Sequence, residues 1–133
     1  MSAVPVVPVR ACALFAGPSM MALAKLSGPL LNVSGKVSFV DFQPQEPFEK
    51  CGTEDPRIVQ HDGTTYLMYT AYDCKKAQLS LATSTNPSDP ASWVRHGPLF
   101  PELPWSKSGA VLIRAQPPHY MFFGDSTFVP GLR

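Results

Sequence analysis

The first 40 residues contain no aspartate or glutamate, and the first acidic residue is Asp41. Over the whole sequence Asp, Glu, Lys and Arg make up only 16% of the residues, and eleven basic against ten acidic side chains leave a formal net charge of +1. A chain with so little excess positive charge lacks the positive electrostatic field that attracts nucleic acids and anionic membranes. We therefore expect neither as a partner.

Long apolar runs and paired cysteines are also missing. No stretch reaches the ~18 consecutive apolar residues that a membrane-spanning helix needs. The three cysteines, Cys12, Cys51 and Cys74, are odd in number and form no CxxC pair, which argues against a disulfide framework and against a structural zinc site. We expect free thiols in a reducing compartment. We also expect no metal, because His61 with Cys51 and Cys74 does not form a ligand set.

The composition of residues 1–40 is that of a leader. Arg10 and Lys25 stand among Ala, Val, Met and Pro, which suits an organellar transit peptide, while "ACALFAG" loosely suits a signal peptide. Prolines at positions 5, 8 and 18 interrupt any amphipathic helix. We therefore divide the chain into a poorly ordered or targeting-like leader, 1–40, and a folded domain, 41–133. A cytoplasmic location is favoured, and organellar targeting stays open.

What the chain does contain beyond the leader is a series of strand signals. "RIVQH" (57–61) and "TTYLMYTAYD" (64–73) flank the turn dipeptide "DG". "AQLSLATS" (77–84) alternates apolar and polar residues, and "WVRHG" (93–97) supplies a fourth short strand. Fifteen prolines and nine glycines favour short elements joined by turns. Four strands with tight connections in about 40 residues match one blade of a β-propeller.

The pattern then begins a second time. "SGAVLIR" (108–114) takes the place of the first strand, and "HYMFFGDS" (119–126) takes the place of the second. Asp73 and Asp125 lie 52 residues apart, and a spacing near 50 is typical of a propeller blade with its linking loop. The second copy stops after two strands. The sequence thus predicts an all-β fold with about one and a half blades of a propeller.

Several sequence blocks carry a family resemblance. In order they are "CGTEDPRI", "DGTTYLMYTAYD", "LATS", "W…RHGPLF" and "KSGAVLI…YMFFGDS", and together they resemble glycoside hydrolase family 130 over roughly residues 44–126. The resemblance implies a five-bladed β-propeller and the activity of mannoside phosphorylases or related mannosidases. The chain holds material for about one and a half of those five blades.

The chemistry of such an enzyme defines which side chains to look for. Cleavage with inversion needs an acid to protonate the leaving oxygen and a nucleophile on the opposite face of the sugar. Phosphate as nucleophile needs no general base, but it needs cations to hold it near a catalytic carboxylate. We therefore expect one carboxylic acid among basic side chains, with inorganic phosphate as a possible co-substrate and no other cofactor.

The "EDPR" block supplies the candidate acid. The resemblance implies that Asp55 is the proton donor, in the phosphorylases through a sugar hydroxyl. Pro56 is expected to fix the backbone and to bias Asp55 to an extended conformation. Glu54 would then bind sugar hydroxyls or orient Arg57, which is itself a candidate ligand for substrate or phosphate.

The remaining candidates lie on later strands. The resemblance implies that Lys107, before the first strand of the second copy, binds substrate or phosphate. Arg95 and His96 are candidate phosphate ligands, or solvated charges on an outer strand. Asp73 and Asp125 close equivalent strands and either bind sugar hydroxyls or simply form turns.

Three functions remain open at this point. The first is cleavage of β-mannosidic bonds with inversion, by phosphorolysis (a hexosyl transfer) or by hydrolysis. The second is a fructan- or arabinan-type propeller glycosidase. Enzymes of the fructan-cleaving type carry an Arg-Asp-Pro motif, and "EDPR" superficially resembles it. The third is a non-catalytic, sugar-binding remnant, because an unclosed propeller exposes strand edges and loses walls of its central pocket.

Overall fold

The computed structural model describes residues 6–11, 19–27, 32–33 and 38–126, and the statements below concern these residues. They form strands and two short 3₁₀ turns, η1 (Pro47–Glu49) and η2 (Pro90–Ser92), so that the chain is all-β as predicted. Neither described helical turn is long and apolar enough to cross a membrane.

The central sheet is the predicted first blade. Its antiparallel strands follow the chain in the order β5 (Gly52–His61), β6 (Thr64–Tyr72), β7 (Ala77–Ser84) and β8 (Val94–Pro98). Between β5 and β6, Asp62 and Gly63 both have positive φ angles, 47° and 74°. These angles suit a tight hairpin turn, so the "DG" dipeptide forms the turn that the sequence predicted.

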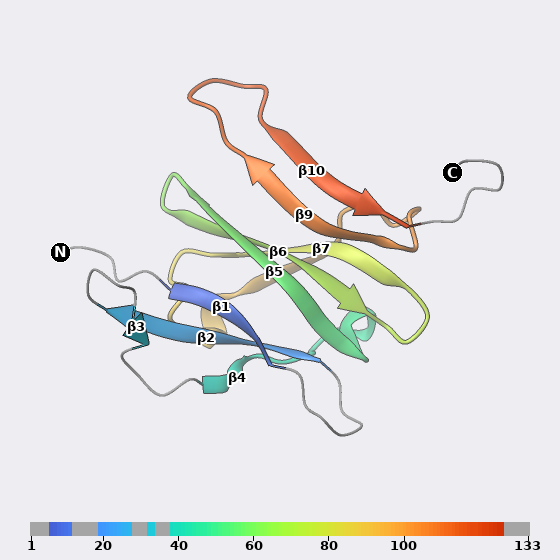
Figure 1. The fold of residues 1–133 in the computed structure, drawn as a ribbon, viewed down its shortest axis with the longest axis horizontal. Helices are drawn as coiled ribbons and strands as arrows, with labels where there is room; N and C mark the ends of the chain where they lie inside the picture. Colours follow the sequence, from blue (N-terminus) through green and yellow to red (C-terminus); the bar gives the residue numbers. More distant parts are fainter. Residues whose placement is uncertain (1–5, 12–18, 28–31, 34–37, 127–133) are drawn as a thin grey trace.

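A second, two-stranded sheet packs on one face of the blade (Figure 1). It consists of β9 (Ser106–Leu112) and β10 (Tyr120–Asp125), paired antiparallel. Met68 and Leu81 of the blade meet Val111 and Met121 of this hairpin around an apolar pocket between the two sheets. The predicted repeat and the partial propeller are therefore confirmed.

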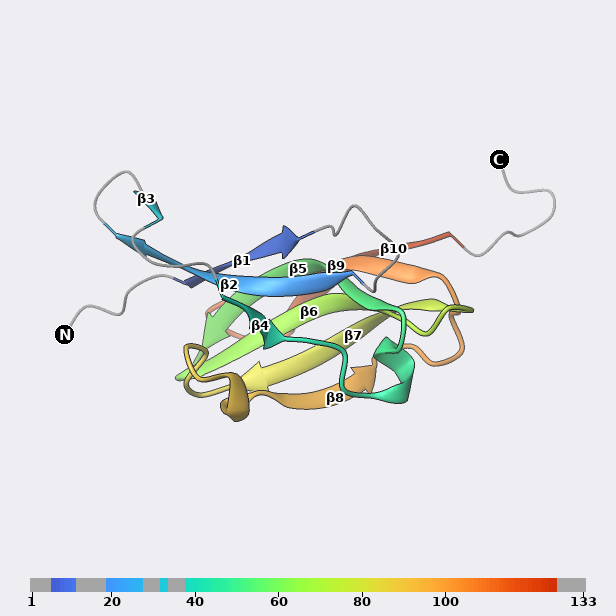
Figure 2. The ribbon, with the colours of Figure 1, turned by 90° about the horizontal axis from the view of Figure 1, so that it is seen from below.

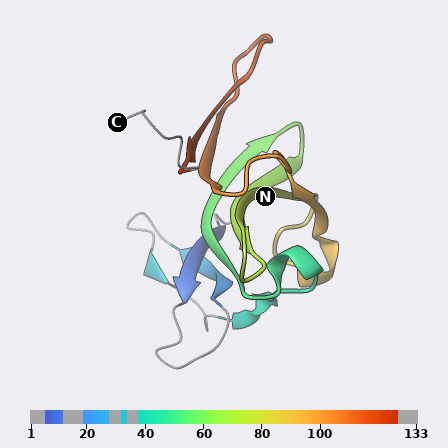
Figure 3. The same cartoon turned by 90° about the vertical axis from the view of Figure 1, so that its right-hand side faces the viewer.

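The other face of the blade carries an N-terminal sheet, so that the blade lies between two flanking sheets (Figures 2 and 3). This sheet has the path β1-β2-β3, with β4 also paired to β2; the strands are β1 (Val6–Ala11), β2 (Met20–Ser27), β3 (Asn32–Val33) and β4 (Ser38–Phe42). Phe42 packs edge-on against Tyr69 and Trp93, and all three are buried together with Met21. The main hydrophobic core thus joins β2 and β4 to the blade.

Paired strands therefore occupy the described part of residues 1–40, where the sequence suggested an irregular leader. Proline argued against a helix there, but Pro8 lies in β1, which pairs on one side with β2 alone. An edge strand tolerates proline because the missing N–H group faces away from the ladder. The division of the chain at residue 40 and a targeting role for the leader stay predictions.

The expectation of free thiols is corrected for two cysteines. Cys51 and Cys74 form a disulfide, with their Cα atoms 5.3 Å apart, across the open end of the β5–β6 hairpin. The backbone N–H of Cys51 also donates to the carbonyl of Tyr72 at 2.8 Å. Spacing along the chain gave no sign of this pair, because the hairpin brings together residues that are 23 positions apart. Cys12 lies outside the described residues.

Candidate active site

Most of the predicted site residues gather at one end of the sheets. β5 and β9 both begin at the right-hand end in Figure 1, where β6 and β10 finish. The residues placed at this end are Glu54, Asp55 and Arg57 on β5, Asp73 directly after β6, Lys107 on β9 and Asp125 at the end of β10. The structure therefore brings six of the eight candidates to a common edge.

A row of paired residues defines the level of the candidate acid within the blade. Glu54 on β5 pairs with Thr70 on β6, and Thr70 pairs with Leu79 on β7. Thr70 is buried, and its side-chain oxygen has no hydrogen-bond partner among the described residues. Asp55 follows Glu54 directly and lies at the same level.

The strand β9 touches the blade at this level. The Oγ atom of Ser106 accepts a hydrogen bond from the backbone N–H of Leu79 at 3.2 Å. A Cβ atom added to Gly109 would lie only 2.5 Å from the side chain of Leu79, so β9 is closely packed there. Lys107 stands between these two contacts. Its position on β9 is therefore level with Asp55 on β5.

The backbone at Asp55 forms a β-bulge. Glu54 pairs with Thr70 and Arg57 pairs with Met68, so that two residues of β5, Asp55 and Pro56, oppose a single residue of β6. Asp55 has a φ angle of 50°, in the left-handed region. Such bulges are frequent beside active sites, where they change the direction of a side chain.

This geometry corrects the expected extended conformation of Asp55. The local preference before proline was overridden by the bulge, and aspartate is among the few non-glycine residues that enter the left-handed region with moderate strain. Strained backbone persists only where the surrounding structure imposes it, and it is concentrated at functional sites. The bulge is therefore an independent reason to single out this half-buried carboxyl group.

Two exposed cations lie at the same end of the sheets. Arg57 follows the bulge, and one guanidinium nitrogen donates to the carbonyl of Pro56 at 3.1 Å. Lys107 is exposed on β9. Each cation has room to bind an anion from solvent.

Asp73 has a local structural role. Its Oδ1 atom accepts hydrogen bonds from the backbone N–H groups of Lys76 at 2.7 Å and Lys75 at 2.8 Å. These two bonds, first that of Lys76, lower the pKa of the Asp73 carboxyl group from its ordinary value. Asp73 thus shapes the β6–β7 turn, and a contact with substrate stays a prediction.

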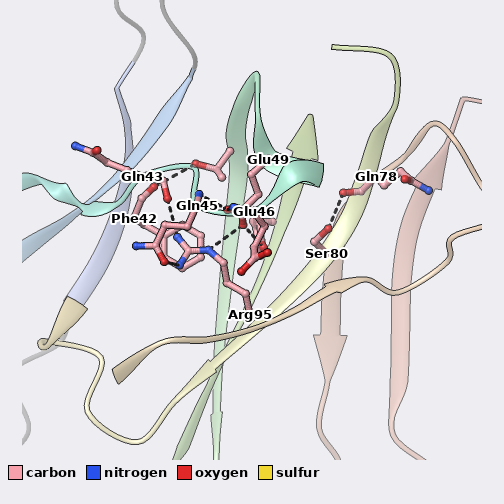
Figure 4. A network of polar contacts seen from close by, with 10 residues as sticks. Phe42, Gln43, Gln45, Glu46, Glu49, Gln78, Ser80 and Arg95 are labelled. Atoms are coloured by element: carbon pink, nitrogen blue, oxygen red, sulfur yellow. Dashed lines mark hydrogen bonds and ion pairs between the residues drawn. The ribbon is translucent and has the colours of Figure 1, made fainter. Parts of the chain in front are cut away.

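Arg95 is part of a buried network (Figure 4). Its Nε atom donates to Oε1 of Glu49 at 2.9 Å, and its two Nη atoms donate at 2.8 Å to the side chain of Gln45 and to the carbonyl of Gln43. The guanidinium group lies 4.0 Å above the Phe42 ring. With 6% of its side chain exposed, Arg95 joins β8 to the segment between β4 and β5.

The structure therefore does not bring Arg95 and His96 to Asp55. Both lie on β8, which is separated from β5 by two strands. His96 is exposed and shares a hydrogen bond of 2.7 Å with Thr83, while all three guanidinium nitrogens of Arg95 are engaged within the protein. The sequence left open whether the two residues bind phosphate or are solvated edge charges, and the alternation along β8 turns Arg95 inward toward Phe42.

Glu49 is a residue that the sequence reading missed. Its side chain is fully buried, and Oε1 accepts from the Tyr69 hydroxyl at 2.5 Å as well as from Arg95. Burial, and then the bond to Glu49, raise the pKa of Tyr69 well above its usual range. Oε2 accepts from the backbone N–H of Gln45 at 2.9 Å and from that of Glu46, the N-cap of η1, at 3.3 Å. The bond from Glu46 is part of a capping box that fixes η1. The signal was "EPFE", a carboxylate three residues after a cap.

No group of three or more His, Cys, Asp or Glu side chains able to hold a metal ion occurs among the described residues. The absence of a metal cofactor stays a prediction.

Comparisons with known proteins identify the family of this chain. The family model of glycoside hydrolase family 130, described as beta-1,4-mannooligosaccharide phosphorylase, matches residues 23–129. A solved protein from Parabacteroides distasonis, assigned as a glycoside hydrolase, is 28% identical with a TM-score of 0.65, over 80% of this chain and 34% of its own. A second, from Bacteroides ovatus with the same assignment, is 26% identical with a TM-score of 0.65, over 90% of this chain and 40% of its own.

A thermostable family-43 glycoside hydrolase shares the fold, with 18% identity and a TM-score of 0.55 over 76% of this chain. None of the curated proteins matches. The chain spans well under half the length of the solved proteins that it resembles. Because the family model covers most of the sequence, including the EDPR bulge, this chain belongs to glycoside hydrolase family 130.

Proposed function

We propose that this chain is the part of a β-mannoside phosphorylase that supplies the proton donor. The observation that carries the proposal is the placement of Asp55 on a left-handed bulge, level with the exposed Lys107 of the neighbouring sheet. The description of the matched family as a phosphorylase of β-1,4-mannooligosaccharides supports the substrate class.

The reaction assigns a role to each group. The Asp55 carboxyl group gives its proton to the glycosidic oxygen, directly or through a sugar hydroxyl, as the bond from that oxygen to the anomeric carbon breaks. Phosphate attacks the anomeric carbon from the opposite face and forms α-mannose 1-phosphate, while the remaining sugar leaves with the proton. Arg57 and Lys107 hold the phosphate, whose negative charge would otherwise be repelled by carboxylates at this end.

The test measures release of mannose 1-phosphate from β-1,4-mannobiose and inorganic phosphate by ³¹P NMR, with the wild-type chain and with Asp55→Asn. Asparagine also tolerates the left-handed backbone but has no acidic proton to give, so we expect activity to fall about 10²-fold or more. The matched control is Asp62→Asn. Asp62 also has a positive φ, 47°, but it lies exposed at the far end of β5.

Each alternative function has its own signature in this experiment. Release of free mannose without a need for phosphate identifies a hydrolase. Binding of mannobiose without turnover identifies a sugar-binding module, a function favoured by the short span of the chain relative to its solved relatives. Undiminished activity of Asp55→Asn rejects Asp55 as the acid.

A further inference from the structure

The bulge at Asp55 has a counterpart on the neighbouring sheet. Lys107 and Ala110 of β9 are three positions apart, but their partners on β10, Gly124 and Phe122, are only two positions apart. The same offset occurs between β5 and β6. The extra residue is Ser108, whose φ angle of 58° is close to the 50° of Asp55. The two strands therefore carry the same irregularity, with Ser108 in the place of Asp55.

Contacts with the blade hold the second bulge in place. The Ser106 hydroxyl accepts from Leu79 and donates to the carbonyl of Leu103 at 3.2 Å, and Gly109 leaves no room for a side chain against Leu79. Ser106 and Gly109, on either side of Ser108, thus face the blade. Ser108 itself is exposed, and its hydroxyl forms no hydrogen bond with another described residue.

Nothing in these contacts explains why a serine occupies this position. The left-handed backbone favours glycine, and serine keeps it only under strain. A strained residue whose side chain has no hydrogen-bond partner among the described residues is the kind of position where function retains a residue against local preference. The exposed hydroxyl group is the part of Ser108 that glycine would lack.

We propose that Ser108 is a substrate-binding residue, whose hydroxyl group binds a hydroxyl of the sugar whose glycosidic oxygen receives the proton of Asp55. The inference rests on the proposed function. Because β9 touches the blade at the level of Glu54, the two bulges present Asp55 and Ser108 at the same level of adjacent sheets. A serine hydroxyl both donates and accepts hydrogen bonds, as sugar hydroxyls require.

The test compares Ser108→Ala and Ser108→Gly with the wild-type chain in NMR titrations with β-1,4-mannobiose. Loss of one neutral hydrogen bond should weaken binding about three- to tenfold in both variants. Ser108→Gly should melt at the same temperature as the wild type or higher, because glycine accepts the positive φ. The matched control is Ser88→Ala, a change at an exposed loop serine remote from β9, which should leave the affinity unchanged.

The outcomes separate this inference from the proposed function. If both Ser108 variants bind mannobiose like the wild type while Asp55→Asn loses activity, Ser108 is not a substrate ligand and the proposed function stands. If inorganic phosphate alone binds more weakly to the variants, the hydroxyl group belongs to the phosphate site and the sugar assignment is wrong. If the wild-type chain neither binds nor cleaves mannobiose, both proposals fail.

Discussion

At the scale of single residues, the pair of Glu49 and Arg95 shows how a buried charge is kept in this fold. Removing both side chains from water carries a desolvation cost, which good geometry and further hydrogen bonds offset. The Tyr69 hydroxyl and the backbone N–H of Gln45 satisfy the carboxylate, while the carbonyl of Gln43 and the side chain of Gln45 satisfy the guanidinium group. The network holds the segment that leads into β5 and hence into the bulge.

Substituting one member of this pair should therefore lower the stability of the fold. We expect Arg95→Met to lower the free energy of unfolding by about 3–5 kcal/mol, because Glu49 then remains as an uncompensated buried charge. Urea unfolding measures the change. Arg114→Met, at an exposed position, is the control and should change stability by about 0.5 kcal/mol or less.

The double variant Glu49→Gln with Arg95→Met removes both charges. Its cost should be clearly smaller than the sum of the two single costs, because the residues interact directly. A cost below ~1 kcal/mol for Arg95→Met would show that the pair contributes little.

The sequence predicted the chemical roles of single residues better than the directions in which their side chains point. It singled out Asp55 because "EDPR" is distinctive, but it could not give the left-handed backbone, since the bulge depends on the pairing with β6. It placed Arg95 on an outer strand correctly and missed that the side chain points inward. Which face a residue presents depends on strand register, and register is fixed by partners that local sequence does not reveal.

At the scale of elements, the strands from residue 52 onward were predicted closely. Alternation along 77–84 and the "DG" turn are local signals, and the structure confirms both. The disulfide between Cys51 and Cys74 and the strands β1 and β2 were missed. The disulfide depends on the hairpin that brings Cys51 and Cys74 together. Pro8 argued only against a helix and gave no sign that this segment is an edge strand paired with β2.

The contact between β9 and the blade gives a prediction for Gly109. We expect Gly109→Ala to destabilise the chain by about 1–3 kcal/mol, because its Cβ would meet two carbon atoms of Leu79 at 2.5 and 2.7 Å. Thermal unfolding measures the effect. Gly124→Ala on the partner strand is the control, since its nearest neighbour would be at an ordinary 3.7 Å. Equal effects of the two changes would contradict the close packing of β9.

At the scale of the whole molecule, the hairpin β9–β10 has an uncovered apolar face. Leu112, Tyr120 and Phe122 are exposed on it, while their neighbours Val111 and Met121 line the pocket against the blade. In a propeller each sheet packs against the next. An apolar face of this kind promotes association when it is left open.

We therefore expect the 133-residue chain to associate with itself as its concentration rises. The double substitution Leu112→Lys with Phe122→Lys should shift it toward monomer, because two charges then oppose burial of this face. Size-exclusion chromatography with light scattering measures the mass. Val94→Lys on β8, where the valine is 57% exposed, should have little effect. A wild-type chain that stays monomeric throughout would contradict the expectation.

For the packing of the fold, the number of residues in β5 matters more than which residue occupies the bulge. The Thr53 hydroxyl donates a hydrogen bond to the carbonyl of Phe42, and Ile58 packs on the hydrophobic core that contains Phe42. Both side chains therefore face the N-terminal sheet, although the two residues are five positions apart. In a regular strand an odd separation puts side chains on opposite faces. Exchanging Asp55 for another residue removes one functional group, whereas deleting it would turn Ile58 and Val59 each to the other's side. Deleting Asp55 would therefore disturb the packing of both faces of β5, whereas substituting it would affect the candidate site alone.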